Sequence, residues 1–252
     1  MLYLQKIEFL LKENCPDGST LTPGAGSCSP DTADGVLYIT DIGSLSSRLI
    51  SAKLPVLGWV HEGNRKENFG GCRYFCEDLQ ELDLKYLERI YRRYKHIPWD
   101  ILETSRCLLR ETTVEDVDSF YQIYASPSIT CFMEPLFTDP QEERIYTQNY
   151  IEKVYGFYEI GIWTVLHKES GRIIGRAGLS FREGYEDPEL GFMIAEDYQG
   201  RGIATEVCQA ILEYGREHFA FTKFLAFVHP ENSASLRVCE KLGNQLEIIP
   251  IR

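Results

Sequence analysis

The sequence has no apolar run near the roughly 20 residues that span a bilayer, and charges interrupt its first thirteen residues. Neither a membrane-spanning helix nor a cleaved secretory signal is expected. Basic residues are also scarce: 26 Lys and Arg stand against 38 Asp and Glu, which gives a formal net charge of −12. This balance argues against nonspecific nucleic-acid binding, which requires a basic surface.

Eight cysteines are present, but they form no Cys-x-x-Cys pair and no histidine stands near them at zinc spacing. We therefore expect no metal site and free thiols in a reducing cytoplasm. Cys72 and Cys76 share a strand-like run. A metal or redox pair there is a weaker interpretation than two small buried hydrophobic residues.

The length of 252 residues suits one large domain or two modest ones. Leu4, Ile7 and Leu10 recur at helical spacing and predict a short amphipathic helix, and the Pro-, Gly- and Ser-rich segment 14–35 predicts a long loop. Strands and helices then alternate, which predicts a small α/β domain with a partly parallel sheet over residues 1–103. Its expected elements are strands at 36–40, 55–60 and 72–76 and helices at 43–53 and 83–95.

A second pattern begins at Thr104, after the break Pro98-Trp99-Asp100. Its order is strand, two helices, three strands, helix, strand, helix, strand, which predicts an α/β domain with one mixed sheet over residues 104–252. The expected strands are 106–110, 162–166, 172–179, 189–194, 224–228 and 246–251, and the expected helices are 113–124, 140–155, 202–218 and 232–242.

The segment Gln199-Gly-Arg-Gly-Ile-Ala204 joins a predicted strand to a predicted helix. A glycine-rich turn of this kind exposes backbone N–H groups at the positive end of a helix, and it can therefore receive phosphate. The Walker A string is absent. The dinucleotide fingerprint requires a third glycine where Thr205 stands, and the preceding hairpin does not suit a βαβ unit. Spacing therefore excludes both nucleotide-binding motifs.

This loop resembles the coenzyme A loop of the GNAT acyltransferase superfamily. Three further segments occur in the family's order and resemble its ribosomal-protein, RimJ/RimL-like branch: Thr104–Arg110 with Asp116, the strand Glu189–Ile194, and Asn232–Ser235 followed by Glu240–Gly243. The resemblance covers about residues 104–252. It implies an acyl-CoA N-acyltransferase fold preceded by the small α/β domain.

The resemblance implies that acetyl-CoA is the acyl donor and that an amine attacks it directly, with no metal. Backbone groups of Met193 and Ile194 would pair with the pantetheine arm, and one of their N–H groups would bind the oxyanion. Asn232 would reach the pantetheine from the last helix. The pyrophosphate would lie on Gln199, Gly200, Arg201, Gly202, Ile203, Ala204 and Thr205.

Proton transfer is where the sequence departs from the family pattern. Cys239 stands where many members carry a tyrosine, and a packing residue is the simpler interpretation of it. We expect Ser235 to protonate the leaving thiolate, as RimL-like members also carry serine there; a hydroxyl bonded to its own helix is the alternative. Glu189 is the best-placed base, unless it is merely structural or a chain of waters removes the proton.

The acceptor site is expected to include Glu134 and Tyr185, in loops whose carboxylates could attract a cationic amine. A solvated acidic face is the alternative. The sequence ends one strand after the last helix, so the acceptor wall is open, or supplied by the N-terminal domain or by a second subunit in a homodimer.

We predict an N-acetyltransferase for a primary amine of a small molecule or of a peptide or protein N-terminus. A catalytically silent acyl-CoA sensor and a ligand-binding scaffold are the alternatives. The segment Asp41-Ile-Gly-Ser44, which follows a predicted strand, is weakly similar to a haloacid-dehalogenase-like fragment, with Thr40-Asp41 as the candidate phosphate-contacting pair. The Asp-x-Asp nucleophile string of that family is missing, so no phosphatase is expected. The segment His61–Asn64 could bind a ligand, although a hydrogen-bonded turn is the preferred interpretation.

Overall fold

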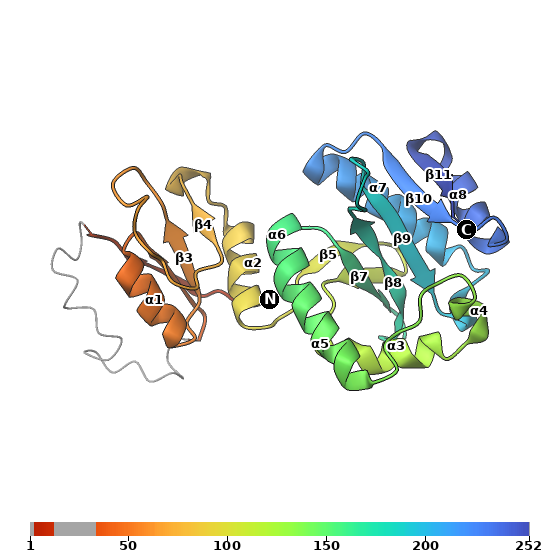
Figure 1. Cartoon of the computed structure of the whole chain (residues 1–252), viewed down its shortest axis with the longest axis horizontal. Helices are drawn as coiled ribbons and strands as arrows, with labels where there is room; N and C mark the ends of the chain where they lie inside the picture. Colours follow the sequence, from red (N-terminus) through yellow and green to blue (C-terminus); the bar gives the residue numbers. More distant parts are fainter. Residues whose placement is uncertain (1–2, 13–33, 252) are drawn as a thin grey trace. The chain divides into compact units, whose positions relative to one another are not determined.

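The computed structural model describes residues 3–12 and 34–251. The chain forms two compact units, Met1–Trp99 and Asp100–Arg252 (Figure 1). The strand β5 (Asp100–Glu103) belongs to the second unit because it pairs antiparallel with β6 (Cys107–Arg110), so this unit begins slightly before the expected boundary at Thr104. In the described ranges no helix is long and apolar enough to cross a membrane.

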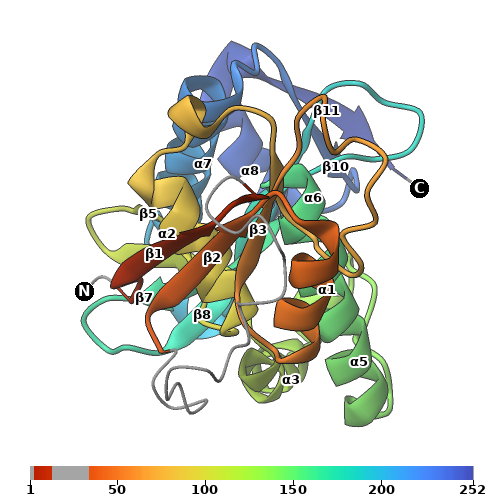
Figure 2. The same ribbon diagram turned by 90° about the vertical axis from the view of Figure 1, so that its left-hand side faces the viewer.

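The first unit contains a four-stranded sheet in the order β1-β2-β3-β4, and every pair in it is parallel. Side chains alternate along the buried strand β2: Leu37 and Ile39 pack toward α2, whereas Val36 and Tyr38 pack toward α1, so a helix covers each face (Figure 2). The elements are β1 (Lys6–Leu10), β2 (Val36–Thr40), α1 (Gly43–Ser51), β3 (Val56–Trp59), β4 (Phe75–Cys76), η3 (Leu79–Glu81) and α2 (Leu84–Tyr94).

Two sequence-based expectations for this unit are wrong. The segment expected to form an amphipathic helix is the strand β1, because its backbone pairs along its whole length with the buried strand β2. The strand expected over 72–76 is only β4, which pairs with β3 at two positions after a glycine-rich stretch. The loop expected over 14–35 lies outside the described residues except for Asp34 and Gly35.

The second unit contains a seven-stranded sheet in the order β11-β10-β9-β8-β7-β6-β5. The four pairs from β5 to β9 are antiparallel, whereas β10 runs parallel to both β9 and β11. The mixed sheet expected from the sequence is confirmed. Its remaining strands are β7 (Ile162–His167), β8 (Ile173–Ser180), β9 (Glu189–Ile194), β10 (Phe224–Val228) and β11 (Leu246–Pro250).

Helices cover both faces of this sheet (Figure 1). α7 and α8 pack on one face around Trp163, Ile211 and Phe224, and α3 packs on the other, where Phe120 is fully buried. The bidentate pair of Arg110 with Asp116 fixes the start of α3, with both bonds at 2.7 Å. The helices are η4 (Val114–Asp116), α3 (Val117–Tyr124), α4 (Pro127–Thr130), α5 (Pro140–Tyr150), η5 (Ile151–Tyr155), α6 (Gly156–Tyr158), η6 (Glu196–Tyr198), α7 (Ile203–Phe219), α8 (Ser233–Leu242) and η7 (Gly243–Gln245).

Candidate active site

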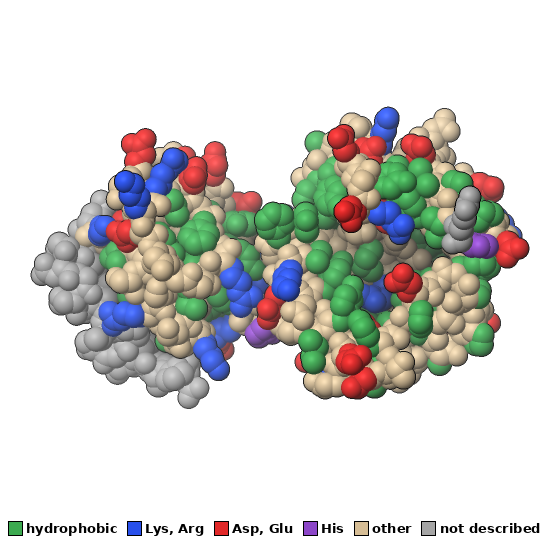
Figure 3. All heavy atoms as spheres, in the orientation of Figure 1, with side chains coloured by type: hydrophobic (Ala, Val, Ile, Leu, Met, Phe, Trp, Pro, Cys, Tyr) green, Lys and Arg blue, Asp and Glu red, His purple; other side chains and the backbone are tan. Residues whose placement is uncertain are grey.

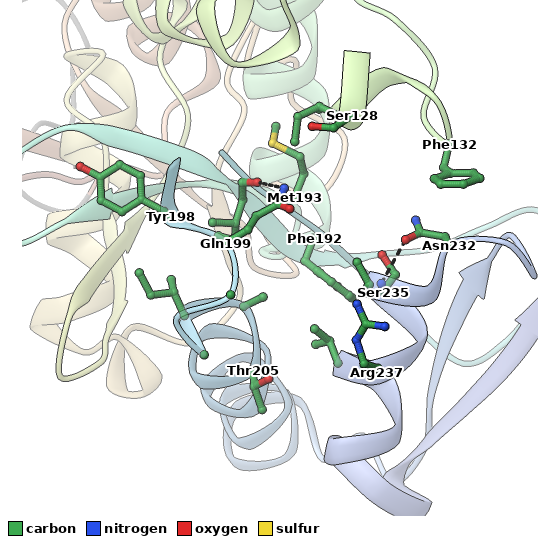
Figure 4. Close-up of a pocket in the computed structure, with 18 of the residues that line it drawn as sticks. Ser128, Phe132, Phe192, Met193, Tyr198, Gln199, Thr205, Asn232, Ser235 and Arg237 are labelled. Carbon is green, nitrogen blue, oxygen red and sulfur yellow. Dashed lines mark hydrogen bonds between the residues drawn. The ribbon is translucent and has the colours of Figure 1, made fainter. Parts of the chain in front are cut away.

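A cleft of about 300 Å³ opens where the parallel strands β9 and β10 separate (Figure 4). The two strands pair at a single position, Leu225 with Glu189, and the rest of this edge of β9 has no strand beside it. Ten residues proposed from the sequence lie around the cleft: Met193, Ile194, Gln199, Gly200, Gly202, Ile203, Ala204, Thr205, Asn232 and Ser235.

The loop before α7 requires its two glycines. Gly200 has φ +70° and Gly202 has φ +77°, both in the left-handed region that side chains with a Cβ rarely adopt. These two residues turn the chain sharply from the end of β9 into the helix. The loop therefore brings backbone, without intervening side chains, to the wall of the cleft.

The N-terminus of α7 is not capped by any side chain. The first helical hydrogen bond runs from the Glu206 N–H to the Gly202 carbonyl, at 3.1 Å. The N–H groups of Ile203, Ala204 and Thr205 precede this bond and line the cleft with the positive end of the helix dipole. An anionic group such as pyrophosphate suits this position.

Gln199 holds the loop in place. Its side-chain amide donates to the Ile194 carbonyl at 2.8 Å, and its own N–H donates to the Glu196 carbonyl at 3.0 Å (Figure 4). These bonds tie the loop to the end of β9. Gln199 therefore positions the glycines in addition to lining the cleft.

The opposite side of the loop is braced from β6. Arg106 donates from Nε to Glu206 at 2.7 Å and from a terminal nitrogen to the Arg201 carbonyl at 2.8 Å. Burial raises the pKa of Glu206, but hydrogen bonds from Thr104, Arg106 and Ser105 outweigh it and lower the pKa to about 2. Glu206 is thus an anion paired with Arg106, and the Arg201 side chain lies over the Tyr198 ring outside the cleft lining.

The free edge of β9 offers backbone groups to a ligand. The Pro188 carbonyl accepts from Leu225 of β10, and the Ala195 N–H donates to Ile174 beside β8. Because backbone groups alternate sides along a strand, Phe192 and Ile194 face the free edge, whereas Met193 faces β8. The side chain of Met193 lines the cleft, whereas the alternation places the backbone groups of Phe192, rather than those of Met193, on the free edge.

α8 forms the wall opposite β9. The Asn232 side chain caps this helix by accepting the Ser235 N–H at 3.0 Å, which leaves its amide N–H groups toward the cleft (Figure 4). In the described structure no protein group hydrogen-bonds to the Ser235 hydroxyl, so the self-bonded alternative is not what the fold shows. Ser235 presents this hydroxyl to the cleft.

Cys239 lies one turn further along α8, and it is 1% exposed within the main core rather than at the cleft. Burial raises the pKa of its thiol to about 11. A buried, protonated thiol away from the cleft is a packing residue, as the simpler interpretation of the sequence has it. The cysteines at 72 and 76 are free thiols, and the described residues contain no cluster of metal ligands.

The residues expected around the acceptor lie outside the cleft lining. Glu189 is paired with Arg182, Nε to Oε2 at 2.9 Å, and its side chain is 18% exposed. Tyr185 is exposed and packs edge-on against Phe227 of β10. Glu134 is exposed and follows Met133, which does line the cleft.

Sequence reasoning missed several residues of the lining. Arg237 and Lys241 on α8 lie at i and i+4, so both positive side chains lie on one side of this helix, at the cleft. Ser128 and Phe132 come from the segment around α4, which precedes α8 by about a hundred residues in the chain. No local pattern connects that segment to the loop. The other missed residues are Ile129, Met133, Phe192, Tyr198, Ala234 and Val238.

The first unit carries a separate polar cluster after its strands. Asp41 accepts the Lys12 N–H at 2.8 Å and lies 3.3 Å from His61 Nε2. The His61 N–H donates to the Asn64 side chain at 2.8 Å, and the Asn64 N–H returns to the His61 carbonyl at 3.0 Å. His61–Asn64 is therefore a hydrogen-bonded turn, the preferred of the two interpretations.

Comparison with known proteins identifies the second unit. Residues 106–245, more than half of the chain, match the family model described as an acetyltransferase (GNAT) domain. The chain is 31% identical to the uncharacterised protein YkkB of Bacillus subtilis, over 56% of this chain and 83% of that protein. It is 27% identical to the uncharacterised N-acetyltransferase p20 of Bacillus licheniformis, over 59% and 84%.

A solved structure of RimL, a ribosomal L7/L12 alpha-N-protein acetyltransferase in complex with coenzyme A, shares this fold. It aligns with a TM-score of 0.50 and 16% identity, over 57% of this chain and 83% of that one.

The chain belongs to the GNAT acetyltransferase family. It is an N-acetyltransferase of this family, and acetyl-CoA is the acyl donor that the family uses.

Proposed function

We propose that the second unit transfers an acetyl group from acetyl-CoA to a primary amine of a small molecule or of a peptide or protein N-terminus. The observation that carries this proposal is the cleft itself. It combines an uncapped helix N-terminus, a free strand edge and an unpartnered serine hydroxyl.

The donor would lie along these three features. The pyrophosphate meets the N–H groups of Ile203, Ala204 and Thr205, with Arg237 and Lys241 adding positive charge from α8. The pantetheine arm pairs with the free edge of β9, as an added strand would, and the Asn232 amide donates to it.

The reaction forms one bond and breaks one. The neutral amine nitrogen attacks the thioester carbonyl, and the Phe192 N–H stabilises the negative charge that develops on its oxygen. The C–S bond then breaks, and the Ser235 hydroxyl gives its proton to the departing sulfur. The amine proton passes through water toward Glu189, where Arg182 holds Oε2 and leaves Oε1 without a hydrogen-bond partner among the described residues.

The acceptor approaches from the side of the loops that carry Glu134 and Tyr185. This chemistry requires neither a metal nor a nucleic acid or membrane partner. The cytoplasmic location and the homodimer remain predictions from the sequence.

Free thiol released from acetyl-CoA in the presence of a panel of amines tests the function. We expect thiol release that depends on the amine, and Ser235→Ala should lower kcat roughly 10- to 100-fold while leaving the Kd for acetyl-CoA unchanged. Cys239→Ala, which alters the same helix away from the cleft, is the matched control and should keep kcat.

A protein that binds acetyl-CoA but releases no thiol with any amine would be the silent sensor instead. An equal loss of kcat in Ser235→Ala and Cys239→Ala would show that Ser235 is not the proton donor.

A further inference from the structure

This inference rests on the proposed function and concerns the face of the sheet from which an acceptor reaches the thioester. Glu189, Gly191 and Met193 alternate on one face of β9, and Met193 packs against Ile123 of α3. Arg176 of β8 pairs directly with Met193 and shares this face. The α3 face therefore carries an arginine one strand away from the edge where the thioester would lie.

Space is available beside this arginine. A Cβ placed on Gly191 would have Ile162 Cδ1, at 3.2 Å, as its only close neighbour. The strand thus has no side chain between Glu189 and Met193 on the α3 face. Figure 3 shows hydrophobic side chains over α5, α6 and the strands beside them, around a hollow that contains a basic side chain. A small molecule has room to lie there.

The Arg176 guanidinium is held in an aromatic setting. Its central carbon lies 4.7 Å from the centre of the buried Phe120 ring, and the Tyr124 hydroxyl is within hydrogen-bonding reach. Its Nε is buried and has no hydrogen-bond partner. Among the described residues no carboxylate lies within ion-pair distance of it. The buried Nε has lost its hydration, and no hydrogen bond from the described residues replaces it.

Other arginines of this unit differ from Arg176 in this respect. Arg110 pairs with Asp116, Arg182 with Glu189, and Arg106 with Glu206. These three arginines each have a carboxylate partner, whereas Arg176 has a buried Nε without any hydrogen-bond partner, which an anion from outside the chain would supply.

Tyr124 adds a second donor. A guanidinium can only donate, so the Tyr124 oxygen acts as the acceptor beside Arg176, and its O–H could donate to a ligand. Burial raises the pKa of Tyr124, which keeps the phenol neutral and able to donate. Arg176 and Tyr124 together match the two oxygens of a carboxylate.

We propose that the acceptor is an amine that carries a carboxylate, an amino acid or a molecule of that class, and that Arg176 binds the carboxylate. Paired residues on adjacent antiparallel strands have Cα atoms about 4.5–5.5 Å apart. An amine at the Phe192 edge and a carboxylate at Arg176 therefore fit within one small molecule. Arg176 is then a determinant of acceptor specificity.

The test compares amino acids with matched acceptors that lack the charge. Thiol release from acetyl-CoA is measured with L-phenylalanine, L-tyrosine and L-methionine, with their carboxamides, and with phenethylamine and tyramine. The full chain should prefer the amino acids over their carboxamides by roughly tenfold or more in kcat/KM, the size of one charge-assisted interaction. Arg176→Gln should remove this preference through KM, and Arg176→Lys should restore part of it.

Two measurements separate a binding role from a merely structural one. The Kd for acetyl-CoA and the Tm of Arg176→Gln should stay near those of the unmodified chain, and Tyr124→Phe should weaken the preference less. If Arg176→Gln does not fold, Arg176→Lys and Tyr124→Phe still report the preference. Equal rates with amino acids and carboxamides, or a preference that survives Arg176→Gln, would overturn the proposal and leave the proposed function standing.

If no amine releases thiol, the proposed function fails, and the carboxylate site is then judged by binding. Calorimetry with the coenzyme A-loaded chain should show binding of an amino acid that Arg176→Gln abolishes. Absence of that binding in the unmodified chain would overturn the site.

Discussion

The N-termini of α7 and α1 are built alike in sequence and differ in what occupies them. Both helices follow a strand and begin at or just after a glycine, Gly202 for α7 and Gly43 for α1. At α1 the Gly43 N–H donates to the Glu67 carboxylate at 2.8 Å, and Lys12 holds that carboxylate in place. At α7, among the described residues, no side chain forms a capping hydrogen bond to the corresponding N–H groups.

This difference shows why a strand–glycine–helix pattern is weak evidence of an anion site on its own. The chain itself can supply the anion, as Glu67 does, and the helix end is then part of the fold. At α7 the only carboxylate in the first turn, Glu206, is paired with Arg106 instead. The helix end that remains open is the one that borders the cleft.

The largest effect should come from making α7 resemble α1. Ala204→Glu places a carboxylate in the first turn of α7 at the cleft, and it should raise the Kd for acetyl-CoA roughly 100-fold through repulsion of the pyrophosphate. Because an acidic residue favours a helix N-terminus, Tm should not fall. Calorimetric titration gives the Kd, and the isosteric Ala204→Gln is the control. An equal rise in the Kd for acetyl-CoA in both variants would show that the size of the new side chain, not its charge, weakens binding.

Removing the brace of the loop should have a smaller effect. Arg106→Gln loses the pairing with Glu206 and the bond to the Arg201 carbonyl, so the loop is less well positioned and the Kd for acetyl-CoA should rise roughly tenfold. Lys168→Gln, which removes an exposed ion pair to Glu103, is the matched control. An unchanged Kd in Arg106→Gln would mean that Gly200 and Gly202 alone determine the conformation of the loop.

The paired anion at α7 should also make the second unit sensitive to acid. The pKa of Glu206 is lowered from 4.5 to about 2 in the fold, so its stabilising contribution is present above about pH 4.5 and is lost as the pH falls toward 2. Thermal unfolding of the chain between pH 6 and pH 3 should show this loss, and Glu206→Gln should show less of it. Identical dependence of Tm on pH in the two proteins would mean that the Arg106–Glu206 pair does not contribute to the loss of stability in acid.

The smallest effect should be local to α1. Glu67→Ala leaves the Gly43 N–H without its acceptor and should cost about 1 kcal/mol, the usual value of a helix cap. Hydrogen exchange at the first amides of α1 measures this directly. Substitution of the exposed neighbour, Glu62→Ala, is the control, and unchanged protection in Glu67→Ala would mean that water replaces the cap.

Most of the second unit could be predicted because its elements have strong local patterns. Ile203, Val207 and Ile211 mark the buried side of α7, and the strands from 162 to 194 alternate as a meander does. The strand β1 could not be predicted, because the spacing of its apolar residues also suits a helix. Pairing with β2 makes this segment a strand. The side that the Met193 backbone groups face could not be predicted for a related reason, because the neighbouring strands fix it.

The sequence alone determined the family resemblance, the glycine-rich loop before α7 and the acyl donor of the family, because these depend on residues that are close together in the chain. The tertiary structure decided which backbone groups of β9 are free, that Cys239 is packed in the core, and that Arg176 lies beside Phe120 with its Nε unpaired among the described residues. Each of these depends on what a distant segment supplies. The sequence shows which hydrogen-bonding and charged groups each residue has. Only the folded structure shows which of these groups already have a partner within the protein.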